Sequence, residues 1–484
     1  MNAEYKNGFE ALLEYAFRHR NGSPNRQAYT AACEDAAREI CEESGNAAQL
    51  VSDGYDRILE IGGYYGAFTE QLALKCAELV CAECDENRRR LIGIRCPNVT
   101  LRGNIPDGRF GLIWVNGCDE SLSDYGFSSL QNAYNTLSEM LTDSGEMIFL
   151  LPKKYLSEAE STFGEDLRII YPYPDLKGTV FFFTDDRTPK KSELFFDETL
   201  CRKNADEKSF SDVFIAIVRK APRKDKLIFS KMSVSRKAEY RIRTDIVSGD
   251  KKYAVKTALP ESNDHVDRME YSFKKLSEIY SRGLISVNRA EKISNGQVRF
   301  DFEEGEELFD IIVSTAKDDP QAAWEYVYRY SEILRSKAHR PFEFTEDFYK
   351  LFGRSLKSAD FYSCKYTNID FCFDNIIVRD GRWIVTDYEF CTNIPVPTDF
   401  VIFRSVFYLF RKMPADTVSL EWEEKIYTRL GIEKHTEAFR RMEYNFQRYI
   451  TGDNIYFSEV IKKCRENGNT PEKALKKLSS GKKL

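Results

Sequence analysis

Five short, mostly apolar runs recur in the first third of the chain, and segments with helical spacing separate several of them. The runs are Arg57–Ile61, Leu79–Cys84, Val99–Arg102, Phe110–Val115 and Glu146–Leu151. Short apolar runs of this kind are typical of strands that are buried on both faces of a parallel sheet. Because strands and helices alternate here, the pattern predicts an α/β fold with a doubly wound, Rossmann-like parallel sheet.

The pattern changes after a short polar segment at Ala221–Asp225. Antiparallel strands are expected next, at Ile228–Phe229, Tyr240–Ile246 and Lys252–Leu259. After Gly305 the spacing is mostly helical, which gives a small sheet lobe followed by a large helical lobe. The helical pattern is interrupted by an expected hairpin of two strands, Asn375–Val378 and Arg382–Thr386. We therefore divide the chain into a first domain at residues 1–221 and a two-lobed α+β domain at residues 225–484.

Composition excludes several classes of protein. The chain has 484 residues, of which 42% are hydrophobic, so it can bury large cores and is not a disordered or fibrous chain. Its net charge of −6 argues against a protein that coats nucleic acid. No apolar run approaches the roughly 20 residues of a membrane span, and the N-terminus lacks the pattern of a signal peptide. We expect a cytoplasmic protein with no transmembrane segment.

Two further features have a structural and a functional interpretation. The last 24 residues carry eight Lys or Arg against two Asp or Glu, which would allow peripheral contact with the inner membrane face, although a solvated helix end is favoured. Cys81 and Cys84 have the spacing of metal ligands, but they lie in a predicted buried strand. We interpret them as core thiols rather than as a zinc site.

A glycine-rich turn follows the first predicted strand, in the run Leu59–Gly66. Glycines allow the backbone to turn sharply there and a ligand to approach closely. Glu83 follows Gly62 by 21 residues, the spacing at which an acid can bind both ribose hydroxyls of a nucleoside. A dinucleotide-binding fingerprint would need glycine at two positions where this chain has Tyr64 and Ala67, so a nicotinamide cofactor is disfavoured.

With its acidic residue before the glycines, this turn resembles motif I of class I S-adenosylmethionine-dependent methyltransferases. The resemblance implies a site for S-adenosylmethionine formed by Glu60, Gly62, Gly63, Gly66, Glu83 and Asn104. Asn104 follows the third predicted strand, where that family contacts the adenine end. An ordinary glycine turn in a sheet is the structural alternative.

A second group of charged residues lies in the other half. Lys256 stands on the third strand of the small lobe, and the following helix offers Glu270, with Asp267 as the alternative, to hold it. A lysine fixed by a carboxylate can bind the α- and β-phosphates of ATP. Further on, Asp370 is followed by Asn375 after five residues and by Asp387 after twelve more.

These elements resemble protein-kinase-like folds, most closely the aminoglycoside and choline phosphotransferase type. The resemblance implies that Asp370 is the catalytic base and that Asn375 and Asp387 hold Mg²⁺ on the phosphates of ATP. Two departures are Asn368, where that family usually has His, and the absence of glycine between Asp225 and Ser248, where a glycine-rich flap would lie.

A methyltransferase followed by a kinase-like domain resembles the bifunctional proteins of bacterial surface-polysaccharide biosynthesis, including those that end O-antigen chains. The resemblance implies an enzyme that phosphorylates and methylates a glycan. Its partners would be a glycan or glycolipid acceptor and glycosyltransferases of the same pathway, with no nucleic acid. The alternative is a non-catalytic scaffold in a polysaccharide assembly complex, which Tyr64 and the missing flap favour.

Overall fold

The computed structural model describes residues 8–19, 33–117, 119–194, 196–197, 199–201, 209–221, 224–414, 421–452 and 457–479. The chain forms two compact units. Unit 1 comprises residues 1–234, 246–250 and 454–484, and unit 2 comprises residues 235–245 and 251–453. Among the described residues, no helix is both long enough and apolar enough to cross a membrane.

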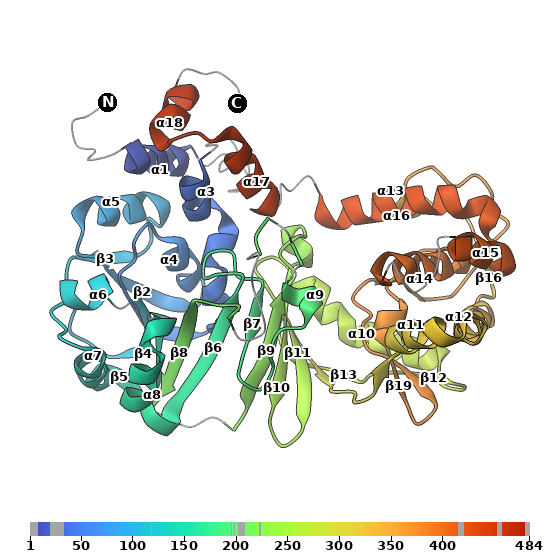
Figure 1. The fold of residues 1–484 in the computed structure, drawn as a ribbon, viewed down its shortest axis with the longest axis horizontal. Coiled ribbons are helices and arrows are strands. Elements are labelled where there is room, and N and C mark those ends of the chain that lie inside the picture. The colour runs from blue at the N-terminus through green and yellow to red at the C-terminus, as the bar shows by residue number, and fades with distance from the viewer. Residues whose placement is uncertain are drawn as a thin grey trace. The chain divides into compact units, whose positions relative to one another are not determined.

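Unit 1 is built on a mixed sheet with the strand order β3-β2-β1-β4-β5-β8-β6-β7-β9 (Figure 1). The strands are β1 (Tyr55–Ile61), β2 (Cys76–Ala82), β3 (Thr100–Arg102), β4 (Phe110–Asn116), β5 (Leu141–Pro152), β6 (Leu167–Tyr173), β7 (Phe181–Phe183), β8 (Val213–Arg219) and β9 (Lys226–Met232). Strands β1 to β5 run parallel, and β8 lies antiparallel between β5 and β6. Each of the five predicted runs overlaps one of the parallel strands, although the run Leu79–Cys84 extends two residues past the end of β2.

Helices cover both faces of this sheet. The helices are the 3-10 helix η1 (Glu42–Leu50), α4 (Ala67–Leu72), α5 (Glu86–Arg95), α6 (Asp119–Asp124), α7 (Leu130–Glu139), α8 (Leu156–Phe163) and the short α9 (Lys191–Leu194). Leu59 and Ile113 pack in one buried cluster with Leu137 of α7, whereas Ile58 and Trp114 pack in another with residues of η1 and α4. Because alternate residues of each strand enter opposite cores, the predicted doubly wound α/β fold is confirmed for this unit.

The order of the strands reverses between β1 and β4. The chain proceeds from β1 to β2 and β3 on one side and from β4 to β5 on the other. In open α/β sheets, ligands bind in the crevice outside the carboxyl ends of the strands at such a switch point. The glycine turn after β1 therefore lies at the carboxyl ends of the strands, beside the ends of β2 and β4.

Four helices from the two ends of the chain pack together in unit 1. They are α1 (Gly8–Arg18), α3 (Glu34–Ile40), α17 (Phe457–Asn467) and α18 (Pro471–Ser479) (Figure 1). Leu13, Ile40, Val460 and Ile461 belong to one buried apolar cluster. The structural division therefore differs from the sequence-based one, which assigned residues 225–484 to the second domain: both β9 and the C-terminal helices belong to unit 1.

Unit 2 begins with antiparallel strands around a helix. The order is β13-β14-β11-β10, formed by β10 (Ile242–Ser248), of which residues 242–245 lie in this unit, β11 (Lys252–Ala258), β13 (Ala290–Ser294) and β14 (Gln297–Asp301). Helix α10 (Asn263–Ile279) follows β11 and buries Val266, Met269 and Leu276. This part agrees with the expected small sheet lobe.

The rest of unit 2 is mainly helical. Its helices are α11 (Leu308–Asp318), α12 (Pro320–Arg335), α13 (Glu346–Phe352), α14 (Thr398–Lys412), α15 (Glu421–Leu430) and α16 (Thr436–Thr451). A small sheet of order β12-β20-β19-β15 contains the predicted hairpin, now β19 (Ile376–Arg379) and β20 (Arg382–Val385), with β12 (Ile285–Val287) and β15 (Glu306–Glu307) beside it. Short β18 (Thr367–Asn368) pairs with β21 (Cys391–Thr392). The pairing of β19 with β20 and of β18 with β21 brings residues 368–391 into one compact segment.

The packing of α17 in unit 1 can be tested with Ile461→Ala. Ile461 is fully buried, so its truncation should lower the free energy of unfolding by about 2–5 kcal/mol. Amide hydrogen exchange, followed by mass spectrometry, should accelerate in α1, α3 and α17. Lys462→Ala, at an exposed neighbouring position, is the control and should change neither quantity. Faster exchange confined to the helices of unit 2 would contradict the assignment.

Candidate functional site

The turn after β1 has three residues with positive φ. Gly62 (φ 76°), Tyr64 (φ 49°) and Gly66 (φ 81°) all adopt the left-handed conformation. Glycine does so without a steric penalty, whereas a tyrosine in this region costs on the order of 1 kcal/mol. Two of the three predicted glycines therefore serve the turn itself, and Tyr64 is held there by its surroundings.

Gly63 is required for a different reason. A Cβ atom at this position would lie 2.4 Å from Sγ of Cys81 and 2.8 Å from Cδ1 of Ile92. The glycine thus allows the turn to pack directly on β2 and α5. Cys81 is a buried thiol, as expected, whereas the interpretation of Cys84 as a core thiol is wrong: β2 ends at Ala82, and Cys84 is exposed just after it.

Glu60 is fully buried at the end of β1. Nδ2 of Asn116, on β4, donates to Glu60 Oε1 (3.0 Å) and to the Gly62 carbonyl (2.7 Å), and Trp114 Nε1 donates to Asn116 Oδ1 (2.7 Å). Burial raises the pKa of Glu60 to about 7. Because its side chain has no exposed surface, Glu60 braces the turn through Asn116 rather than facing a ligand.

Glu83 follows β2 and is tied to the glycine turn. The Tyr64 amide donates to Glu83 Oε2 (2.8 Å), and the Asp85 amide donates to Oε1 (3.1 Å). Burial raises the pKa of Glu83, and these two amides act in the opposite direction. The Cys84 thiol also donates to Oε1 (3.9 Å), and Glu83 is only 2% exposed. A carboxylate has about four acceptor positions, so the capacity that remains for a hydroxyl of a ribose is mainly on Oε2. This acceptor fits the ribose of S-adenosylmethionine, while Asn104 lies in an exposed bend after β3.

Two side chains beside Glu83 were not identified from the sequence. The Arg88 guanidinium lies 5.1 Å from the centre of the Tyr64 ring. The Tyr125 hydroxyl donates to the Ala82 carbonyl (2.6 Å) and accepts from the Cys84 amide (3.1 Å). Arg88 lies on α5 and Tyr125 just after α6, so both reach the site only through the fold.

Lys256 is buried on β11, and its partners differ from the expected ones. Its Nζ donates to Asp387 Oδ1 (2.8 Å) and to Glu389 Oε1 (2.6 Å). Glu270 instead pairs with Lys274 one turn along α10 (3.3 Å), and Asp267 pairs with Lys292 (2.6 Å). The prediction that Glu270 holds Lys256 is wrong: Met269 faces the core of unit 2, and Glu270 follows it around the helix to the half-exposed side.

Glu389 is the acid at the centre of this group. Arg236 Nη1 donates to Glu389 Oε2 (2.6 Å), and His265 Nε2, on α10, lies 3.7 Å from the same oxygen. Burial opposes ionisation, but the charges of Arg236 and Lys256 hold the pKa of Glu389 well below its usual range. The pKa of Asp387 is raised by burial and by Glu389, against the effect of Lys256.

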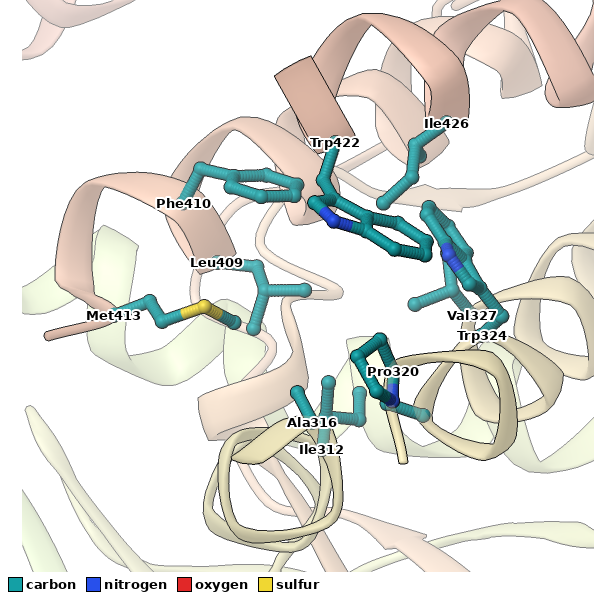
Figure 2. A pocket seen from close by; sticks show the side chains of 11 residues that line it. Ile312, Ala316, Pro320, Trp324, Val327, Leu409, Phe410, Met413, Trp422 and Ile426 are labelled. Carbon is teal, nitrogen blue, oxygen red and sulfur yellow. The ribbon is translucent and has the colours of Figure 1, made fainter. Parts of the chain in front are cut away.

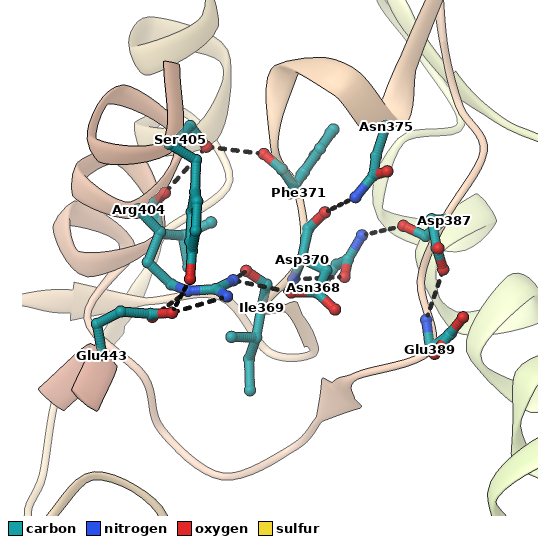
Figure 3. A network of polar contacts seen from close by, with 12 residues as sticks. Asn368, Ile369, Asp370, Phe371, Asn375, Asp387, Glu389, Arg404, Ser405 and Glu443 are labelled. Atoms are coloured by element: carbon teal, nitrogen blue, oxygen red, sulfur yellow. Dashed lines mark hydrogen bonds and ion pairs between the residues drawn. The ribbon is translucent and has the colours of Figure 1, made fainter. Parts of the chain in front are cut away.

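Asn368 joins the two acidic loops of unit 2, as Figure 3 shows. Its Nδ2 donates to the Asp387 carbonyl (2.9 Å), and its Oδ1 accepts from the Asp370 amide (3.0 Å). Asn375 Nδ2 donates to the Asp370 carbonyl (2.8 Å). The structure therefore gathers Asp370, Asn375, Asp387 and Lys256 in one place, with Asn368 as the connecting residue.

The oxygens of this group suit Mg²⁺. Asn375 uses its amide nitrogen within the loop, which leaves its amide oxygen for a ligand, and Asp387 uses only Oδ1 for Lys256. Amide and carboxylate oxygens, completed by substrate phosphates, are the usual ligands of Mg²⁺. In the part of the chain that the structure describes, no cluster of three or more His, Cys, Asp or Glu side chains is arranged to hold a metal ion.

A small apolar crevice in unit 2 is separate from these residues (Figure 2). It lies between α11, α12, α14 and α15, and the rings of Trp324 and Trp422 stack beside it with centres 6.0 Å apart. Its volume of about 30 Å³ corresponds to roughly one or two water molecules. None of the predicted site residues lines it.

Comparison with known proteins gives a likeness of fold for part of the chain. The chain matches no protein-family model and no curated protein. Similar solved structures include the N-methyltransferase NodS from Bradyrhizobium japonicum in complex with S-adenosyl-l-homocysteine (15% identity, 44% of this chain, 98% of that one, TM-score 0.24). An rRNA methylase from Streptococcus thermophilus (12%, 37%, 95%, 0.25) and a predicted O-methyltransferase from Agrobacterium tumefaciens (13%, 37%, 81%, 0.26) are also similar. At such identities the likeness concerns the Rossmann-like methyltransferase fold alone.

The buried Glu60 predicts a dependence of stability on pH. Its pKa is about 7 in the folded protein against an ordinary 4.5, so between these values only the unfolded chain releases the proton. The free energy of unfolding should therefore fall by roughly 3 kcal/mol as the pH rises from 4.5 to above 7. Glu60→Gln should lack this decrease in the free energy of unfolding between pH 4.5 and pH 8. Urea unfolding of both chains at the two pH values measures it.

Glu78→Gln is the matched control, because Glu78 lies on the neighbouring β2, is half exposed and pairs with Arg57. It should leave the pH dependence of the parent chain unchanged. If Glu60→Gln shows the same decline as the parent chain, Glu60 is already ionised in the folded protein.

Proposed function

We propose that this chain is a bifunctional transferase acting on a bacterial surface glycan or its glycolipid precursor. Unit 2 would transfer the γ-phosphoryl group of ATP to a hydroxyl of the glycan, and unit 1 would use S-adenosylmethionine to methylate the product. The observation that carries the phosphotransfer proposal is the convergence of Lys256, Asp370, Asn375 and Asp387.

The roles of these side chains follow from their chemistry. Lys256 has three N–H donors, of which two are used by Asp387 and Glu389, so the third is available to a phosphate oxygen. Asp387 and Asn375 would hold Mg²⁺, which when bound neutralises charge on the phosphates. Asp370 would accept the proton of the attacking hydroxyl, because its carboxylate lies next to the metal ligands and remains partly exposed.

The methyltransferase half of the proposal is supported by Glu83. This acid lies at the carboxyl end of β2, beside the turn at the switch point of the sheet, where nucleosides bind in α/β folds. Glu83 would accept hydrogen bonds from the ribose hydroxyls, and the turn at Gly62–Gly66 would lie along the cofactor. The cytoplasm is where ATP and S-adenosylmethionine would meet the precursor.

A second candidate function is that of a non-catalytic scaffold in a polysaccharide assembly complex. Tyr64 favours it, since its side chain stands where a methyltransferase turn has glycine, and Arg88 lies over its ring. Lys256 also uses two of its donors within the protein. Titration of the full chain with S-adenosylmethionine and with Mg-ATP separates the two functions, because a scaffold without these sites binds neither ligand.

The phosphotransfer site predicts that two carboxylate variants fail differently. Asp387→Asn removes the anion proposed to hold Mg²⁺, so the affinity for Mg-ATP should fall by at least about tenfold, together with turnover. Asp370→Asn keeps the shape of the side chain, and Asp370 is not among the residues proposed to hold Mg²⁺ or the phosphates. This variant should therefore bind Mg-ATP normally. Its phosphate transfer should fall by about 10²–10⁴-fold, as expected when a general base is lost.

Calorimetry and transfer of label from γ-labelled ATP to the host's polysaccharide fraction measure the two effects. Asp374→Asn is the control, since Asp374 lies in the same segment but pairs with Lys412 at the surface. It should resemble the parent chain in both assays. Transfer at the parental rate by Asp370→Asn would exclude Asp370 as the base.

The first site predicts a loss of cofactor affinity in Glu83→Ala. Removing a charged acceptor of the ribose should weaken S-adenosylmethionine binding by about 10–100-fold in calorimetry. Glu78→Ala, on the exposed part of the same strand, should bind like the parent chain. Equal affinity in Glu83→Ala and the parent chain would show that another residue receives the ribose.

A further inference from the structure

Arg404 on α14 reaches the acid that the proposed reaction uses as its base. Its Nη1 donates to Asp370 Oδ1 (2.9 Å) and also to the Ile369 carbonyl (Figure 3). The residue is 2% exposed, so the guanidinium cannot turn toward solvent. One oxygen of Asp370 is therefore fixed by a buried cation that is 34 positions away in the sequence.

The other end of the guanidinium is fixed as well. Arg404 Nε and Nη2 donate to the two carboxylate oxygens of Glu443 on α16, in the paired geometry that only arginine can form. Glu443 in turn accepts from the Tyr408 hydroxyl (2.6 Å) and from Gln447 Nε2 (2.7 Å). Since every group in this chain of contacts is buried or held, Arg404 has one orientation.

The consequence for Asp370 is an asymmetric carboxylate. Oδ1 accepts from Arg404, whereas no described residue donates a hydrogen bond to Oδ2, and the side chain is 23% exposed. The backbone of the same loop is held separately, because the Tyr330 and Ser405 hydroxyls both donate to the Phe371 carbonyl. These two bonds hold the backbone of the loop independently of Arg404. What Arg404 adds is a fixed orientation of the Asp370 carboxylate.

We infer that Arg404 is the positioning residue of Asp370, and that it aims Oδ2 at the acceptor hydroxyl while Glu443 keeps the guanidinium in place. The inference rests on the proposed phosphotransfer. Phosphoryl transfer depends mostly on the alignment of the attacking oxygen and little on the strength of the base. A cation beside the carboxylate weakens it as a base but fixes its direction, which suits this reaction.

Arg404→Lys tests the inference in the full chain. A lysine keeps the charge but cannot contact Asp370, the Ile369 carbonyl and both oxygens of Glu443 together. We expect the turnover number for transfer from γ-labelled ATP to the host's polysaccharide fraction to fall by about 10–100-fold. The affinity for Mg-ATP should stay within about twofold of the parent value, because Arg404 touches neither Lys256 nor Asp387.

Ser405→Ala is the matched control, since it lies next to Arg404 on α14 and loses a bond to the same loop without touching Asp370. Its turnover should stay within about threefold of the parent chain. Glu443→Gln, which weakens the hold on Arg404 and leaves Asp370 intact, should lower turnover to an intermediate value at unchanged Mg-ATP affinity. A crystal structure of Arg404→Lys should show the Asp370 carboxylate rotated.

The outcomes separate the inference from the proposed function. If the parent chain transfers phosphate and Arg404→Lys does so equally fast, or if its Asp370 carboxylate keeps its orientation, the inference is wrong and the proposed function stands. Equal losses in Arg404→Lys and Ser405→Ala would show a structural role only. If the parent chain binds Mg-ATP but labels no polysaccharide, the proposed function fails, and the inference fails with it.

Discussion

The buried ion network of unit 2 is the constraint on which its candidate site depends. Three cations and four carboxylates meet there: Arg236, Lys256 and Arg404 with Asp370, Asp387, Glu389 and Glu443. Buried charges persist only when they are paired and hydrogen-bonded, so each cation in this network bridges two acceptors. The set has one carboxylate more than it has cations, and His265 also lies 3.7 Å from Glu389 Oε2. Asp370 and Asp387 are its more exposed acids.

The sequence predicts those parts of the two sites that are local in the chain. The glycine turn, its acid at Glu83 and the run from Asn368 to Glu389 each lie in or beside a predicted strand, and all are found there. The partner of Lys256 was not predictable in the same way. Glu389 is 133 positions away from Lys256, and the choice between it and Glu270 depends on which face of α10 meets the core.

The limits of the domains were not predictable for a related reason. Helix α17 has an apolar face, and the sequence shows that this face must be buried but not against which partner. In the structure it packs with α3 and α1, so the last described residues stabilise the unit in which the chain begins. Strand β9 likewise pairs with β7, although its sequence pattern resembles that of the antiparallel strands expected in the second domain.

Glu83 ties the conformation of the glycine turn to the carboxyl end of β2. Its carboxylate accepts the amide of Tyr64, the one residue of the turn that is strained by its positive φ, and this bond offsets part of that strain. Under the proposed function, a ribose hydroxyl that donates to the same carboxylate would hold it in place and thereby also reinforce the strained turn. Binding of S-adenosylmethionine would then be linked to the backbone of the switch point through a single side chain.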